Sequence, residues 1–267
     1  YVRTKFALAS GKAHTLKTSM YDCADIITPY DTPWRVIMAA ERPVDLIAHN
    51  FIYLNLNEPN VLQGDLSWIR PGKTFRSGLS QKEALAAVDF AAERGLQYIH
   101  LDAGWYGPEM KMESDATRIS ESKDLDIKAI CDYASTKGIG VWLYVNQRAL
   151  VQQIDRLLPL YKEWGIKGIK FGFVQVGNQF WTIWLHKAVR QCADYGIMVD
   201  IHDEYRPTGV SRTLPHLMTQ EGIAGNETMP DARHNTILPF TRFLCGPADY
   251  TPVSYTHLRA HETRGNL

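Results

Sequence analysis

A thirty-residue segment that begins at Met198 gathers acidic side chains at two neighbouring places. Each place is the end of a short apolar run, and a loop with a Pro-Thr-Gly turn joins the two runs. Carboxylates clustered at strand ends are costly unless they bind a cation, pair with a cationic group or serve a substrate that needs an acid and a base. The segment therefore predicts a site of acid–base or metal chemistry. Its candidate side chains are His202, Asp203, Glu204, Glu221 and Glu227.

Glu221 and Glu227 are spaced so that they can work together. Between them lie Gly222 and Gly225, which let the backbone turn sharply enough for both carboxylates to face one cavity. A carboxylic acid whose pKa is raised by burial or by neighbouring negative charge can protonate a leaving group, so either residue is a candidate general acid. The alternative is a pair of exposed loop glutamates without a chemical role.

The elements that must hold these side chains follow a regular order from Ile69 onward. Amphipathic helices that end in glycine are followed at once by apolar strands, which is typical of right-handed βαβ units. Such units in series predict an α/β fold, a (β/α)8 TIM barrel that is incomplete at its last strand. The alternative, a doubly wound sheet, lacks a glycine-rich phosphate loop after any strand. We expect strands within 68–78, 98–107, 140–146, 166–174, 197–203, 215–221 and 242–250, and helices within 82–95, 125–138, 149–165 and 180–196.

The two ends of the chain differ from this central part. Residues 1–68 contain strand-like patterns in YVRTKFALA, TPWRVIMAA and LIAHNFIYLNLN, which predict the end of an N-terminal β-sandwich domain and a linker. Residues 69–252 form the predicted barrel, which we expect to be truncated. Residues 253–267 have no hydrophobic period and resemble the translation of a sequencing adaptor, with a polar native tail as the alternative.

Composition excludes several classes of partner. The chain has 267 residues and a formal net charge of zero, so nothing favours nucleic acid as a partner. No unbroken apolar run is long enough for membrane insertion. The four cysteines are scattered singly, which suggests neither a zinc site nor a disulfide framework. We expect a monomer that binds an oligosaccharide, since the many aromatic rings suit sugar faces.

In a barrel of this kind the carboxyl ends of the strands carry the active site. Polar groups recur at these strand ends, and structural needs alone rarely produce such repetition. In chain order they are Asp102, Asn146, Lys170 with Gly172, His202 with Asp203, Glu221 with Glu227, and Asp249.

Several long motifs resemble those of glycoside hydrolase family 97. They are LDAGWYG, IKFGFVQVG, VDIHDEYRPTG, RTLPHLMTQEGIAGNE and CGPADYTP, and the similarity extends from about Thr32 to Pro252. The resemblance implies an exo-acting α-glucosidase or α-galactosidase that binds Ca²⁺ through glutamates beside its catalytic acid. It also implies an N-terminal β-sandwich, a catalytic barrel and a small C-terminal β domain. We expect the full-length protein to be periplasmic or secreted.

The resemblance also suggests individual roles. Glu227 matches the general acid, while Glu221 and Asp203, together with Glu227, match the calcium site. The general base is Asp203 or Glu204, and the sequence leaves both open. His202 is expected to donate a hydrogen bond to substrate, with a structural histidine as the alternative.

Lys170, Phe171 and Gly172 depart from the retaining members of the family. Those members carry Lys-x-Asp here, with the Asp as covalent nucleophile, whereas this chain has Gly172. Without that carboxylate we expect inversion, with water attacking from the far face of the sugar. Glycine would leave space for this water, and the two carboxyl groups would stand roughly 6.5–9.5 Å apart. Lys170 itself is expected to bind substrate.

Asp102 and Trp105 are the other predicted sugar contacts. The carboxylate can bind two hydroxyl groups while the indole stacks on the ring, although Asp102 could instead cap the following loop. A different class of function is a catalytically weak carbohydrate-binding barrel, favoured by Gly172 and by Asn146 in place of a base. A metal-dependent isomerase or aldolase would need a phosphate-binding loop or a Schiff-base lysine, for which only Lys170 qualifies.

Overall fold

The computed structural model describes residues 4–251, and its centre is one parallel sheet. The sheet has six strands in sequence order, each followed along the chain by a helix or loop that leads to the next strand. This confirms the predicted α/β class with parallel βαβ units. The strands are β3 (Thr74–Ser77), β4 (Tyr98–Leu101), β5 (Gly140–Asn146), β6 (Gly168–Gly172), β7 (Met198–Ile201) and β8 (Leu217–Gln220).

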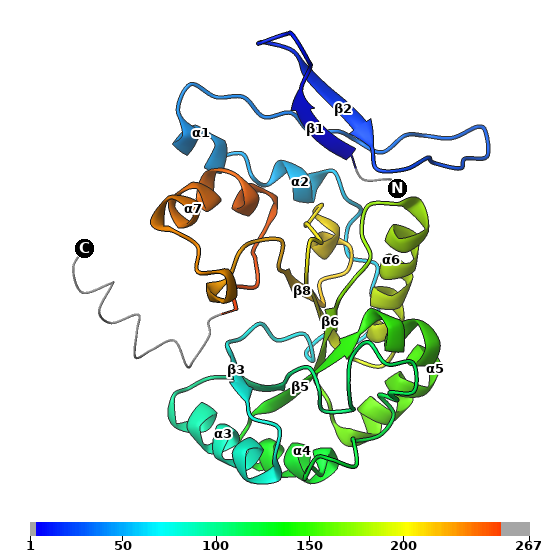
Figure 1. Ribbon diagram of the computed structural model, residues 1–267, viewed down its shortest axis with the longest axis vertical. Helices are drawn as coiled ribbons and strands as arrows, with labels where there is room; N and C mark the ends of the chain where they lie inside the picture. Colours follow the sequence, from blue (N-terminus) through cyan, green and yellow to red (C-terminus); the bar gives the residue numbers. More distant parts are fainter. Residues whose placement is uncertain (1–3, 252–267) are drawn as a thin grey trace.

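Four helices cover the outer side of this sheet in an arc (Figure 1). They begin at side chains that accept a backbone N–H of the first turn, such as Ser80 for α3 and Asn178 for α6. The Ser80 hydroxyl also donates to the Glu83 carboxylate at 2.7 Å. Gly165 ends α5 in the left-handed conformation at φ 88°. These helices are α3 (Gln81–Glu93), α4 (Ile127–Thr136), α5 (Gln147–Trp164) and α6 (Gln179–Asp194).

The core lies between the strands and these helices. Apolar residues of β4, β5, β6 and β7 pack against the buried faces of α3, α4, α5 and α6 in one continuous cluster. Burial of this apolar surface is the main term that stabilises the fold. The opposite faces of β4 to β7 carry polar groups, and this alternation directs those groups away from the helices.

The expected seventh strand within 242–250 is wrong for most of its length. Arg242–Cys245 forms a short 3-10 helix, and only Ala248 pairs with the sheet, through a single parallel bridge to Gln220. Gly246 at φ 134° and Pro247, which lacks an N–H, interrupt an extended run between these two pieces. The described part of the parallel sheet therefore has six strands and one bridge.

The N-terminal part differs more from the prediction. Two antiparallel strands, β1 (Thr4–Leu8) and β2 (Leu16–Met20), form a hairpin, so the strand in YVRTKFALA is confirmed. TPWRVIMAA has no regular structure, and LIAHNFIYLNLN contains helical turns instead of a strand. Pro43 favours the first turn of a helix and cannot donate to a ladder, which explains part of this difference. The two short helices are α1 (Pro43–Ile47) and α2 (Ile52–Asn55).

The remaining elements follow β8, apart from one 3-10 helix that precedes it, and several of them lie near α1 and α2 (Figure 1). None of the helices between residues 4 and 251 has the length and apolarity required to cross a membrane. The tail predicted for 253–267 lies outside the described residues. These remaining elements are the helix α7 (Ala232–Ile237) and 3-10 helices at Val210–Arg212, Asn226–Thr228, Leu238–Phe240 and Arg242–Cys245.

Candidate active site

Polar side chains from three strands meet at the carboxyl end of the parallel sheet. Lys170 of β6 pairs in register with Asp200 of β7, and His202 follows β7 directly. Asp102 follows β4 in the same way. Each of these four side chains belongs to a residue that is less than a tenth exposed, so their charges interact in a medium of low polarity. The sequence-based prediction that these strand ends converge agrees with this arrangement.

Cationic side chains lie around the Asp102 carboxylate. Its carboxylate lies 3.0 Å from the Nε of Arg76 and 3.6 Å from the Nζ of Lys170. Burial alone would raise the pKa of Asp102, but His100 and Lys170 outweigh it and the pKa is lowered overall. The carboxylate also accepts the N–H of Ala103 at 2.9 Å, so the predicted alternative, a loop cap, is part of its role. Asp102 is therefore an ionised group that fixes the Lys170 ammonium at the sheet edge.

His202 lies between three carboxyl groups. Its Nε2 donates to the carboxylate of Asp249, and its Nδ1 lies 3.4 Å from the Oε2 of Glu221. Asp200 is hydrogen-bonded to Asp249, and burial followed by the charge of Asp249 raises the pKa of Asp200 well above its usual range. Burial would raise the pKa of Asp249 too, but the hydrogen bond from His202 outweighs this and lowers it to about 2. A proton on Asp200 thus supports an ionised Asp249, which orients the His202 ring.

This network predicts an unusual pH dependence for the Asp200→Asn variant. A raised folded-state pKa means that Asp200 favours folding below its unfolded pKa of about 3.9, and that this contribution is lost as pH rises towards the folded pKa. Asparagine keeps a donor for Asp249 and has no such loss. We therefore expect the unfolding free energy of Asp200→Asn, relative to the parent, to increase by about 1–3 kcal/mol between pH 4 and pH 7. Urea unfolding at both pH values measures this change in unfolding free energy.

The control is the exposed Asp155→Asn variant, whose unfolding free energy relative to the parent should not change between the two pH values. An equal change in both variants would contradict a protonated Asp200.

A direct hydrogen bond joins Asp203 and Glu221 at the ends of β7 and β8. The N–H of Asp203 donates to the Glu221 carboxylate at 2.7 Å, and the Asp203 carboxylate accepts the N–H of Val174 at 2.8 Å. Asp203 has φ 63°, a backbone conformation that non-glycine residues seldom adopt and that often marks functional sites. Burial is the largest cause of a raised pKa at Glu221, and the Asp203 charge adds to it. Two of the three predicted calcium ligands are therefore adjacent.

Glu227 and Glu204 are more exposed than this pair. Glu227 lies in the 3-10 helix Asn226–Thr228 and makes no hydrogen bond or ion pair with another residue of the described chain. The segment before it is anchored, since Tyr250 donates to the side chain of Asn226 at 2.5 Å. Glu204 is exposed beside Asp203. Among the described residues, no hydrogen bond or ion pair therefore joins Glu227 to Glu221.

Two expectations about the site are wrong. Trp105 is fully buried, and its indole N–H donates to the backbone oxygen of Tyr144 at 2.7 Å, so it cannot stack on a sugar. An indole is a large apolar group, and here it packs against Tyr106, Tyr161 and Trp164 of the core. The space expected beside Gly172 is also filled. A Cβ on Gly172 would lie 2.1 Å from the ring and hydroxyl of Tyr144.

The sequence did not reveal two groups that shape this edge. The guanidinium of Arg242 donates to the backbone oxygens of Gln220 and Glu221, both at 2.9 Å, and so fixes the end of β8. Glu109 accepts the N–H of Gly104 at 2.6 Å, and burial raises its pKa. Both belong to irregular segments, where periodicity gives no signal. Asp200, by contrast, lies two residues before His202, and strand alternation could have placed it on the same face.

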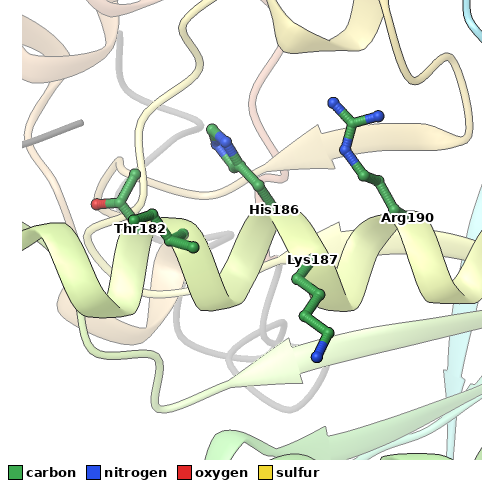
Figure 2. A pocket seen from close by; sticks show the side chains of 5 residues that line it. Thr182, His186, Lys187 and Arg190 are labelled. Carbon is green, nitrogen blue, oxygen red and sulfur yellow. The ribbon is translucent and has the colours of Figure 1, made fainter. Parts of the chain in front are cut away.

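A separate pocket of about 310 Å³ lies along α6. Figure 2 shows Thr182, His186 and Arg190 on one side of the helix and Lys187 pointing elsewhere. All of its lining residues belong to α6, and none is a predicted site residue. Burial lowers the pKa of His186 to about 4, so the ring is neutral at pH 7. This pocket is therefore distinct from the carboxyl edge of the sheet.

Comparisons with known proteins agree with the resemblance in the motifs. Residues 59–223 match the family described as Glycoside hydrolase 97. A retaining alpha-galactosidase from Bacteroides thetaiotaomicron is 31% identical over an alignment of 249 residues, and the match covers 85% of this chain and 37% of that protein. A probable retaining alpha-galactosidase from Streptomyces bingchenggensis is 31% identical over an alignment of 236 residues, and that match covers 84% of this chain and 36% of the relative. The chain thus spans little more than a third of these relatives.

Solved structures give the same result. A Glycoside Hydrolase Family 97 enzyme from Pseudoalteromonas sp. strain K8 superposes with a TM-score of 0.70 at 27% identity, covering 80% of this chain and 39% of that one. The same enzyme has been solved in complex with acarbose and, as a variant, with panose, at a TM-score of 0.69 in both cases. The chain therefore belongs to glycoside hydrolase family 97.

Proposed function

We propose that this chain forms the catalytic (β/α)8-barrel part of an exo-acting α-glycoside hydrolase, which releases glucose or galactose from α-linked oligosaccharides. The observation that carries the proposal is the convergence of Asp102, Lys170, Asp203 and Glu221 at the carboxyl edge of the parallel sheet. Active sites of parallel α/β barrels lie at this edge. The α-galactosidase names of the curated relatives, and the acarbose and panose complexes, support an α-linked oligosaccharide as substrate.

The proposed reaction uses a general acid, a general base and a set of sugar-binding groups. Glu227 donates its proton to the glycosidic oxygen as the bond from the anomeric carbon to that oxygen breaks. Asp203 or Glu204 accepts the proton of the attacking water. Lys170, Asp102 and His202 bind sugar hydroxyl groups, and their buried, mutually paired charges keep them in fixed positions. The product is the free sugar, and the leaving group departs as an alcohol.

A calcium ion would be held by Glu221 and by Asp203, whose N–H donates to the Glu221 carboxylate. The donor set is made of carboxylate oxygens, which suits a hard cation. The raised pKa of Glu221 reflects unfavourable burial beside Asp203, a cost that a bound cation would offset. When bound, the ion would supply positive charge that stabilises negative charge developing in the transition state. The guanidinium of Arg242, which is not one of these ligands, donates to the backbone oxygen of Glu221 and so keeps the end of β8 in place.

The proposed stereochemical course is inversion, whereas the two curated relatives are named as retaining. Gly172 has no side chain to serve as a nucleophile, and the Tyr144 ring fills the volume that such a side chain would need. Direct displacement by water is then the simplest course. We further propose that the protein is a monomer, and that at full length it includes an N-terminal β-sandwich and acts in the periplasm or outside the cell.

The direct test is hydrolysis of aryl α-galactosides and aryl α-glucosides by the full-length protein. We expect turnover of at least one of the two, and a loss of activity by ten-fold or more with a calcium chelator, reversed by added Ca²⁺. Both effects follow from a metal-assisted glycosidase site. Sugar binding without turnover of any α-glycoside would instead indicate a carbohydrate-binding barrel. Turnover that a chelator leaves unchanged would remove calcium from the proposal.

A further inference from the structure

Tyr144 is a buried tyrosine of β5 whose hydroxyl lies where a side chain on residue 172 would begin. We propose that this hydroxyl is a positioning group that orients the attacking water, at the place where a side chain on residue 172 would otherwise lie. The inference rests on the proposed inverting hydrolase. It assigns to Tyr144 a role that the strand-end pattern did not reveal, since tyrosine in a strand is most often a core residue.

The first support is steric. Tyr144 of β5 pairs in register with Lys170 of β6, so its ring lies beside the end of β6. A Cβ on Gly172 would lie 2.1 Å from the Cε2 and the hydroxyl oxygen of Tyr144 and 2.2 Å from Cζ. Real Cβ atoms do not approach other atoms so closely, and a buried ring cannot move aside freely. The Tyr144 ring and a carboxylate at residue 172 therefore exclude each other.

The second support is an unsatisfied hydroxyl. Tyr144 is 5% exposed, and its hydroxyl oxygen has no hydrogen-bond partner among the described residues. Leaving a buried polar group unpaired costs about 1–3 kcal/mol, so phenylalanine would serve the fold better. Tyr161 shows the ordinary case, because its buried hydroxyl donates to the backbone oxygen of Ala116 at 2.9 Å. The Tyr144 hydroxyl thus has a hydrogen-bonding capacity that none of the described residues uses.

The third support is the charge around the ring. The Lys170 ammonium lies 5.9 Å from the centre of the Tyr144 ring, and Lys170 in turn contacts Asp102. Burial first, and then the nearby charges of Glu109 and Asp203, raise the pKa of Tyr144, so the phenol keeps its proton at working pH. A neutral phenol both donates and accepts hydrogen bonds. It can therefore fix the orientation of a water whose proton passes to the Asp203 or Glu204 carboxylate.

The test compares two variants of Tyr144 with the parent in the full-length protein. Tyr144→Phe removes only the hydroxyl, so we expect kcat on an aryl α-glycoside to fall by about 10²-fold, with KM within two-fold and no loss of Tm. Tyr144→Ala opens the volume beside Gly172. Here added azide should take the place of the water and yield a β-glycosyl azide, which the parent does not form. This product is a readout that a purely structural role would not change.

Tyr161→Phe is the matched control. It removes a satisfied buried hydroxyl outside the site, so it should lower Tm without changing kcat of the folded protein. If Tyr144→Phe keeps the parental kcat, or behaves like Tyr161→Phe, the inference is overturned while the hydrolase proposal stands. Retention of configuration by the parent, or no turnover of any α-glycoside, would overturn the proposed function together with this inference.

Discussion

The Glu227→Gln variant is expected to lose about 10²–10⁴-fold in kcat on natural α-linked oligosaccharides. Glutamine preserves the size of the side chain but cannot give a proton to the glycosidic oxygen, so an alkoxide would have to leave unassisted. Glu227 follows Asn226, whose side chain and N–H are held by Tyr250 and Thr251. The variant should therefore keep its backbone position and lose chemistry only.

The loss of activity in Glu227→Gln should depend strongly on the leaving group. Aryl glycosides with acidic phenols need little protonation, so Glu227→Gln should retain far more of the parental rate on them than on oligosaccharides. Rates on a series of aryl glycosides of graded phenol pKa measure this dependence. Glu163→Gln, an exposed position in the last turn of α5, is the matched control and should match the parent throughout. An equal loss on every substrate would exclude Glu227 as the general acid.

The parallel sheet was predictable because its signals are local and repeated. Each helix from α3 to α6 has a buried apolar face, and each is followed within a few residues by a strand that is almost wholly buried. Glycine at helix ends and Ser80 at a helix start mark the boundaries. The N-terminal part carries weaker patterns. Alternation over 46–57 was wrongly read as a strand, since short helices with few buried residues leave almost the same pattern.

The site was predictable to the level of strand ends but no further. Topology places Asp102, Lys170 and His202 at one edge once the strands are parallel, and the structure agrees. Which side chain faces the cavity and which faces the core depends on packing, and this explains the error at Trp105. The contact between Tyr144 and Gly172 joins two strands, so only coordinates reveal it.

Residue 172 of this family 97 chain is a glycine and offers no carboxylate as a nucleophile. In a retaining enzyme two carboxyl groups stand about 5–5.5 Å apart and one of them bonds to the sugar. Here the Tyr144 ring and hydroxyl lie within 2.2 Å of where the side chain at residue 172 would begin. A variant that adds Asp at Gly172 would clash with this ring before it reached a sugar. On the proposed inverting course, water attacks the anomeric carbon directly and the glycosidic oxygen leaves from the opposite face.

Proton NMR of the first sugar released from an aryl α-glycoside tests this claim most directly. The spectrum must be followed within the first minutes, before mutarotation mixes the anomers. A single displacement by water predicts that the β anomer appears first and that the α anomer grows in later. Release of the α anomer first would show a double displacement, as the names of the curated relatives imply for those enzymes, and would contradict the account.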